Sequence, residues 1–138
     1  MKTIPVITLW QPWATWIIRG WKTIETKTHS RFKRLLGCRI GIHAGLYVDS
    51  SDAVIRNPYL TRAQIHENPD EVIGGYLLGT ARVSNFRLLK AEHSPAALID
   101  CGTVQRFGIF LEDVQKLSKP IKTKGAKGIW YFEYFSPL

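Results

Sequence analysis

The chain has 138 residues, of which 45% are hydrophobic and 22% are charged, and its formal net charge is +8. This length and balance are typical of one globular domain, so we expect a single domain over residues 1–138. No run approaches the roughly 18 apolar residues that a membrane helix needs, and we expect no membrane partner. The opening MKTIPVITLWQPW lacks the small-residue cleavage site of a secretory signal.

Cysteine and histidine usage bears on compartment and metal binding. Cys38 and Cys101 are isolated and lack metal-ligand spacing, which favours two reduced thiols in a cytoplasmic protein. His29, His66 and His93 have no partner at metal spacing either. No glycine-rich phosphate loop follows a strand. We therefore predict neither a metal site nor a cofactor.

The positive charge lies at the two ends of the sequence. The first forty residues hold eight lysines or arginines and the single acid Glu25, whereas residues 41–80 hold two basic residues and five acids. Residues 113–138 are basic again, with five lysines against two acids. If the two ends meet in the fold, they form one basic face, for which phosphate-bearing partners are the natural ligands. Lysines that merely keep the surface soluble are the alternative.

Taken in chain order, the first predicted element is a buried strand over residues 4–9. A helix follows, with Pro12 at its first turn, where a missing N–H costs nothing, and Gly20 at its end. One face of this helix carries three apolar side chains, those of Trp13, Trp16 and Ile17.

The segment after the helix has the pattern Gly20-x-Lys22-x-x-Glu25-x-Lys27. Residues 23–28 alternate as a strand does, which predicts Lys22 on one face and both Glu25 and Lys27 on the other. A lysine three residues from a carboxylate can pair with it and present its charge to a phosphate or carbonyl. A solvent-exposed strand is the alternative explanation of the pattern.

The remaining elements follow from turn residues and apolar runs. Residues 49–70 are acidic and predict one or two short peripheral helices, with Ser50, Ser51 and Thr61 as caps. Ser94 is expected to cap a helix over residues 94–99. The other expectations are a basic turn over 31–34, strands over 38–43, 72–89, 105–111 and 128–135, and a basic loop over 116–127.

These elements predict an α+β fold. Five or six mostly antiparallel strands with one early helix, short connections and short peripheral helices favour a small, closed or nearly closed β-barrel, which also removes exposed strand edges. An open α+β sandwich is the alternative.

Aromatic and histidine side chains supply further candidates. Trp13 and Trp16 are predicted in the core, whereas Trp10 and Trp21 flank the helix and can present a ring on which a nucleobase stacks. His43 ends an apolar strand and is better explained as a structural histidine than as a ligand.

Three segments of the sequence resemble the ASCH domain, a branch of the PUA-like superfamily, and together they span nearly the whole chain. LWQPWATWIIRGWKTIETK is similar to the family's Q-P-W-A opening followed by G-x-K-x-x-E-x-R. RIGIHAG resembles its next strand, which usually ends in I-H-A. FGIFLEDVQKLSKPIKTKGAKGIW is similar to its C-terminal run.

The resemblance implies a PUA-like β-barrel with Lys22 and Glu25 in a cleft beside the first helix, and RNA, another nucleic acid or a nucleotide as the ligand. Lys27 departs from the family's arginine and so lacks the planar fork that holds phosphates through two hydrogen bonds. We expect the ligand-binding residues to be Trp10, Gln11, Pro12, Trp13, Trp21, Lys22, Glu25, Lys27, Arg31, Lys33, Arg34, Lys122, Lys124 and Lys127.

Three alternatives to a binding module stay open. A ribonuclease could use Lys22 with Glu25 or His43. One branch of the family removes acetyl from N4-acetylcytidine with a lysine, a threonine three residues later and a glutamate from a later strand. Here Glu25 stands at the threonine position and Arg82 at the later-strand position, which disfavours that reaction. A protein partner could bind the acidic segment 49–70.

Overall fold

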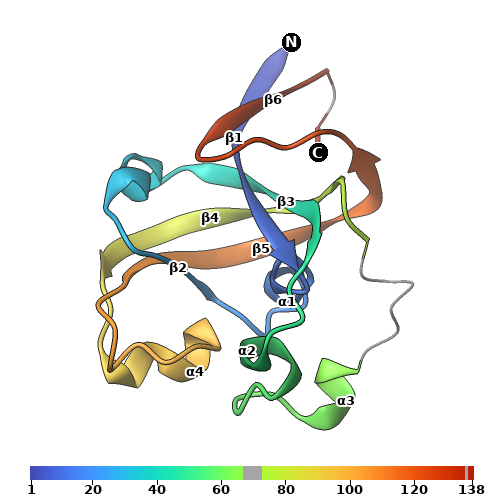
Figure 1. Ribbon diagram of the computed structural model, residues 1–138. Coiled ribbons are helices and arrows are strands. Elements are labelled where there is room, and N and C mark those ends of the chain that lie inside the picture. Colours follow the sequence, from blue (N-terminus) through green and yellow to red (C-terminus); the bar gives the residue numbers. More distant parts are fainter. Residues whose placement is uncertain (67–72, 136) are drawn as a thin grey trace.

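The computed structural model describes residues 1–66, 73–135 and 137–138. It is an α+β fold in which one six-stranded sheet curls around the core (Figure 1). The strands are β1 (Lys2–Gln11), β2 (Ile24–Lys27), β3 (Arg39–Val48), β4 (Tyr76–Leu88), β5 (Phe107–Lys122) and β6 (Trp130–Tyr134). The helices are α1 (Trp13–Ile18), α2 (Asp52–Ile55), α3 (Arg62–Ile65) and α4 (Ser94–Ala97), with 3₁₀ turns η1 (Arg31–Leu35) and η3 (Ala91–His93).

The sheet has the strand order β2-β5-β4-β3-β1-β6. Every neighbouring pair is antiparallel except β1 and β3, which run parallel with Val6 opposite Gly41 and Thr8 opposite His43. A parallel pair needs a crossover, and here α1, β2 and η1 provide it. No ladder joins β2 to β6 within the described ranges, so the barrel is open between these two edges.

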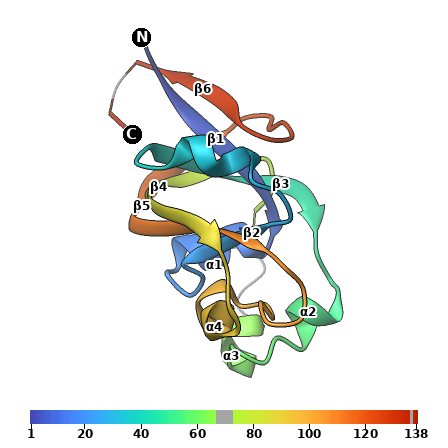
Figure 2. The same ribbon diagram turned by 90° about the vertical axis from the view of Figure 1, so that its left-hand side faces the viewer.

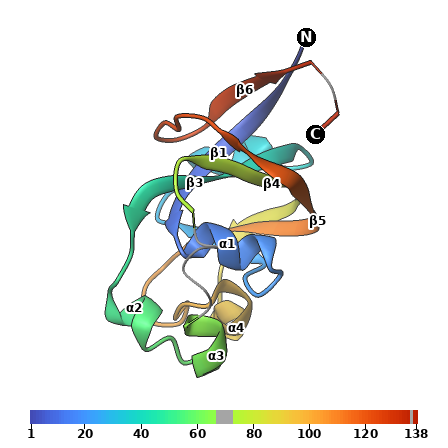
Figure 3. The same ribbon diagram turned by 90° about the vertical axis from the view of Figure 1, so that its right-hand side faces the viewer.

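The core lies inside the curl of the sheet. Its main cluster combines apolar side chains of β1, β3, β4 and β5 with α1 and η1, among them Ile7, Ile17, Ile42, Val83 and Ile109. A second cluster joins β1 to β6 through Val6 and Trp130. The helices α2, α3 and α4 gather at one end, away from β6 and the two termini (Figures 2 and 3). The two basic ends of the chain meet in the fold, because β1 pairs with β6.

Several sequence predictions about local structure are confirmed. Gly20 follows α1 with φ +81°, the left-handed conformation that glycine accepts at a helix end. Thr61 caps α3 in a reciprocal capping box with Gln64. Residues 67–70 of the acidic segment lie outside the described residues, as do residue 71 and the first residue, 72, of the predicted strand 72–89. The β4 strand begins at Tyr76.

Three strands run further than predicted, and the first of them, β1, extends beyond the predicted residues 4–9 at both ends. The β3 strand continues through Ala44 to Val48, where it pairs with Gln11 of β1 after a register shift that places extra residues in β3. The predicted loop 116–127 is wrong in its first half, since β5 continues to Lys122. After a register shift near Asp113, which has φ +48°, pairing with β4 resumes at Thr80 opposite Gln115. The lysines of this stretch are exposed on a paired strand, so their abundance did not indicate a loop.

The predicted cap at Ser94 is also wrong. Ser94 is the first residue of α4, and His93 occupies the cap position. The buried Ser94 hydroxyl instead accepts a hydrogen bond from the Cys101 N–H at 2.9 Å. This contact closes the turn that returns the chain towards β5.

Candidate functional site

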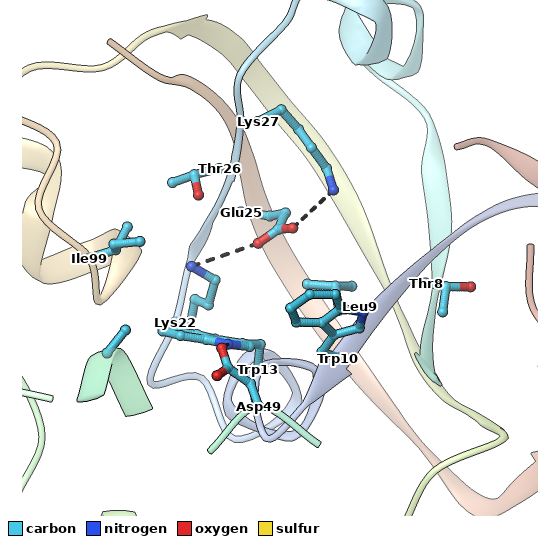
Figure 4. A pocket seen from close by; sticks show the side chains of 11 residues that line it. Thr8, Leu9, Trp10, Trp13, Lys22, Glu25, Thr26, Lys27, Asp49 and Ile99 are labelled. Carbon is cyan, nitrogen blue, oxygen red and sulfur yellow. Dashed lines mark hydrogen bonds and ion pairs between the residues drawn. The ribbon is translucent and has the colours of Figure 1, made fainter. Parts of the chain in front are cut away.

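A cavity of about 350 Å³ opens between the end of β1, α1 and β2, and we call it the central cavity. Figure 4 shows the charged and aromatic side chains that surround it. Its lining residues are Thr8, Leu9, Trp10, Trp13, Lys22, Glu25, Thr26, Lys27, Asp49, Ala53 and Ile99.

The turn after α1 aims Lys22 into this cavity. The backbone N–H groups of Trp21 and Lys22 both donate to the carbonyl of Trp16, at 3.0 and 3.1 Å. Trp16 itself is 1% exposed and packs against Val54 and Leu98, so this turn is fixed to the core. The Lys22 ammonium therefore lies 5.1 Å from the centre of the Trp13 ring, in cation–π range (Figure 4).

The charged groups form one row, lysine–glutamate–lysine. Lys22 Nζ lies 3.8 Å from one Glu25 oxygen, and Lys27 Nζ lies 3.2 Å from the other. Lys22 is 2% exposed and also donates a hydrogen bond to the Ala97 carbonyl. Burial lowers the pKa of Lys22 from its ordinary value, and the Glu25 charge opposes this shift only in part.

The exposure of these side chains decides against a solvent-exposed strand, because both Lys22 and Glu25 are buried. The predicted alternation is correct for β2, where Ile24 faces the core while Glu25 and Lys27 line the cavity. It is wrong for Lys22, which lies on the same side as Glu25. Lys22 precedes the first residue of β2, and its backbone follows the turn from α1 rather than the pleat.

Asp49 forms the opposite wall of the cavity. Its carboxylate accepts hydrogen bonds from the Trp13 Nε1–H at 2.8 Å and from the Ser51 N–H at 3.0 Å. Burial would raise the pKa of Asp49, but the hydrogen bonds from Ser51 and Trp13 outweigh it and lower that pKa. Asp49 thus fixes the plane of the Trp13 ring at the position where the ring meets Lys22.

Three predicted binding residues that are close in sequence to the cavity residues, Gln11, Pro12 and Trp21, do not line the cavity. Gln11 is fully buried and holds the start of α1, since its amide donates to Thr15 Oγ1 and to the Ile73 carbonyl and accepts from the Thr15 N–H. Trp21 packs against the cluster of Trp16, Val54 and Leu98 instead. Pro12 is half-buried at the cap of α1.

Two further hollows adjoin the central cavity. The η1 hollow, of about 610 Å³, is lined by Lys27, His29, Arg31, Phe32, Arg34, Lys127, Gly128 and Ile129. The loop hollow, of about 720 Å³, is lined by Thr8, Trp10, His43, Gly45, Leu46, Gly75 and residues 122–127. Between them, these hollows contain the lysines and arginines of the predicted binding set, with two exceptions. Lys22 lines the central cavity instead, and Lys33 is exposed on η1 and lines none of the three spaces.

His43 is held from both sides of its ring. Its Nε2 lies 2.7 Å from the Thr123 carbonyl, which can only accept, so Nε2 carries the proton and Nδ1 accepts from the Thr8 hydroxyl at 3.1 Å. Trp130 Nε1–H donates to the same hydroxyl at 2.9 Å. Burial lowers the pKa of His43, which favours the neutral ring. This network supports the structural role and leaves neither nitrogen free to act as a base.

Sequence reasoning missed several residues of the central cavity, namely Thr8, Leu9, Thr26, Asp49, Ala53 and Ile99. Asp49 alone carried a signal, as the first acid of the segment 49–70. Arg82 is exposed on β4 and pairs with Glu112, so it does not reach the cavity. The described residues contain no cluster of three potential metal ligands among histidine, cysteine, aspartate and glutamate, and both cysteines are free thiols.

Comparison with solved structures decides the fold. The crystal structure of ASCH from Zymomonas mobilis superposes with a TM-score of 0.58 at 17% identity, covering 94% of this chain and 87% of that one. The chain has the ASCH fold. A single-residue variant of the same Zymomonas mobilis protein gives a TM-score of 0.54 at 15% identity over the same shares, and another gives 0.50 at 18% identity over 86% and 74%.

The structural match confirms the predicted ASCH-type α+β architecture. No protein-family profile matches the chain, and no curated protein matches it significantly by sequence. At this identity the ASCH neighbours establish the arrangement of the chain, while the chemistry must be argued from its own residues. Within the described part, no helix is long and apolar enough to cross a membrane.

Proposed function

We propose that the protein binds RNA or another nucleic acid, with an unpaired base in the central cavity and the adjacent phosphates on the basic hollows. The observation that carries the proposal is the buried Lys22–Glu25 pair between tryptophan rings, in a cavity that opens onto hollows lined by lysines and arginines. The ASCH fold, for which the sequence resemblance implies RNA as a ligand, supports the same conclusion.

The cavity offers both kinds of hydrogen-bonding partner that a base edge needs. Lys22 and Lys27 are donors, and Glu25 and Asp49 are acceptors. The tryptophan rings supply apolar faces on which a base can stack. Because Lys22 is almost completely buried, only a base that has left its own stack can reach it. The proposed ligand is therefore a single strand or an unpaired nucleotide.

The proposal predicts salt-sensitive binding. A labelled single-stranded RNA titrated at increasing salt should lose affinity with a log–log slope of about −0.7 for each phosphate contact.

The variant Lys22→Met should abolish most of the binding, because it removes the donor inside the cavity. Lys116→Met is the control, since Lys116 is an exposed lysine that lines neither the central cavity nor the two hollows beside it. Absence of binding at low salt, or an affinity that does not depend on salt, would refute the proposal.

One observation favours a second candidate, a hydrolase. A lysine whose pKa is lowered by burial and that lies beside a carboxylate is a common arrangement in catalytic sites. A ribonuclease using Lys22 and Glu25 predicts RNA cleavage that disappears in Lys22→Ala. We expect no release of cytidine from N4-acetylcytidine, because Glu25 is no substitute for the hydroxyl of that reaction. Turnover that depends on Lys22 would contradict this expectation.

A further inference from the structure

The loop hollow is continuous with the central cavity. Thr8 and Trp10, which lie near the end of strand β1, line both spaces. Trp10 is 55% exposed, so its ring forms the ridge between the two spaces rather than a wall that separates them. A ligand that extends out of the central cavity past Trp10 therefore enters the loop hollow.

An exposed aromatic pair marks this passage. The Trp10 and Tyr47 rings lie 4.4 Å apart between centroids, at an interplanar angle of 56°. Tyr47 is 57% exposed, and its neighbour Leu46, which lines the hollow, is 83% exposed. Large side chains that stay exposed together in this way mark a contact surface for another molecule.

The lysine-rich loop over residues 122–127 is fixed in place. The Thr123 carbonyl accepts from His43, and its N–H donates to the Gly75 carbonyl at 3.1 Å. Gly125 packs so closely that a Cβ there would lie 2.5 Å from Thr8 Oγ1 and 2.7 Å from the His43 ring. The loop backbone therefore has a defined position before any ligand binds, which reduces the entropy lost on binding.

The lysine side chains of the loop are available to a ligand. Lys122, Lys124 and Lys127 are exposed. Among the described residues, no carboxylate lies within 4.0 Å of their ammonium groups, whereas Lys22 and Lys27 share Glu25. The loop hollow thus combines exposed rings, an apolar floor and uncompensated positive charge, which is the combination that single-stranded nucleic acids require.

We propose that the loop hollow is a second subsite, which holds the nucleotides next to the one in the central cavity. A neighbouring base stacks on the Trp10–Tyr47 pair, and the phosphates lie along Lys122, Lys124 and Lys127. This inference rests on the proposed function, and it specifies the ligand as a single strand of several nucleotides rather than a free nucleotide. A protein or peptide on the same surface is the competing occupant, and the test distinguishes it.

The test is the dependence of affinity on oligonucleotide length. Wild type should bind a single-stranded tetranucleotide at least tenfold more tightly than a mononucleotide of the same base. In a Lys122→Gln/Lys124→Gln variant most of this gain should disappear, because the tetranucleotide loses more phosphate contacts than the mononucleotide does. Two lost phosphate contacts should also reduce the steepness of the salt dependence by about 1.4 log units per log unit of salt. The matched control is Lys116→Gln/Lys119→Gln, which removes the same charge from exposed positions of β5, the strand that leads into the loop.

Two further variants examine the aromatic pair and the loop position. Tyr47→Ala should reduce tetranucleotide affinity about fivefold or more, the loss expected when one base stops stacking, and should leave mononucleotide affinity unchanged. Gly125→Ala displaces the loop and should have the same selective effect, while thermal melting monitors its folding. If both variants lose tetranucleotide affinity as the Lys122→Gln/Lys124→Gln variant does, the results support binding of a single strand along the loop hollow.

Equal affinities for the mononucleotide and the tetranucleotide would overturn this inference while leaving the proposed function intact. So would a length-dependent gain that survives in the Lys122→Gln/Lys124→Gln variant. Absence of binding to either nucleotide ligand would instead refute the proposed function itself, and would leave the exposed pair as a surface for a protein partner.

Discussion

The central cavity and the loop hollow meet at the ridge formed by Trp10, but their charged side chains differ in pairing and exposure. In the cavity, each lysine has a carboxylate within 4.0 Å, and Lys22 is buried. In the loop hollow, the lysines are exposed and, among the described residues, have no acidic partner. Paired donors and acceptors suit a neutral group with both kinds of polar edge, whereas unpaired cations suit phosphate. The difference predicts which part of a nucleotide each region recognises.

The two regions should also differ in how they respond to mutation. Removing one member of a buried charge pair leaves the other without compensation and destabilises the protein. Removing an exposed lysine alters little in the folded protein. Changes in the cavity should therefore affect stability and binding together, and changes in the hollow should affect binding alone.

The largest effect is expected for Glu25→Gln. This change leaves Lys22 buried beside a neutral amide, and should lower the free energy of unfolding by about 1–3 kcal/mol at neutral pH. Because the native pKa of Lys22 lies below its ordinary 10.5, the native state binds fewer protons, and stability rises with pH through the interval below 10.5. Loss of Glu25 lowers that pKa further, so the destabilisation should shrink as the pH approaches 10.5. Denaturant unfolding at neutral and alkaline pH measures it.

Glu112→Gln is the matched control for this comparison. Glu112 also pairs with a cation, Arg82, but both side chains are about half exposed. Exposed pairs contribute little, so the change should cost less than about 1 kcal/mol. Equal losses in the two variants would contradict the role assigned to burial. The 9% exposure of Glu25, against the half-exposed Glu112, is the reason for expecting the larger loss at Glu25.

A smaller effect is expected for His43→Gln, at the boundary between the two regions. Loss of the ring contacts should cost about 1–2 kcal/mol near neutral pH. The native pKa of His43 lies below its ordinary 6.5, so the stability due to the neutral ring is complete above 6.5 and is lost as the pH falls below it. Wild type should therefore lose stability more steeply on acidification below 6.5 than the variant does.

The control for His43 is His29→Gln, because the His29 ring accepts a local hydrogen bond from the Arg31 N–H and stacks on Phe32. That variant should retain the wild-type acid dependence contributed by His43. Parallel stability curves for wild type and His43→Gln would show that His43 does not titrate in this interval. They would also contradict the role assigned to the His43–Thr123 hydrogen bond in holding the loop.

The smallest effect is expected for the exposed lysines of the hollow. Lys122→Gln and Lys124→Gln should each change the free energy of unfolding by less than about 0.5 kcal/mol. Chemical denaturation of each single variant measures this. A loss of more than about 1 kcal/mol would show that the loop lysines stabilise the fold, and the contrast between the two regions would no longer hold.

The sequence allowed the architecture and the charge-bearing core of the site to be predicted, because these depend on local patterns. Gly20 ends α1, Ile24 points inward from β2, and Lys22 and Glu25 are close enough in sequence to pair. The sharing of one face by Lys22 and Glu25 escaped prediction, since it depends on hydrogen bonds to the Trp16 carbonyl that no periodicity records.

The parts that could not be predicted come from contacts between distant segments. Asp49 meets Trp13 only because β3 runs beside β1 to its end, where Gln11 pairs with Val48. Trp10 and Trp21 looked equivalent at the two ends of one helix, yet Trp10 forms the ridge of the site and Trp21 packs away from it. Such differences are set by tertiary packing rather than by side-chain type.

The pairing of β1 with β6 has a consequence for the order in which the molecule folds. It joins Lys2 to Tyr134 and Val6 to Trp130, so this ladder closes the longest loop among the strand pairs. Contacts so distant in sequence form slowly, because the entropy of loop closure precedes any gain from pairing. Trp130 also fixes the Thr8 hydroxyl to which His43 bonds. The loop hollow should therefore be among the last parts to assemble, and refolding monitored by Trp130 fluorescence should lag behind formation of the β3–β4–β5 sheet.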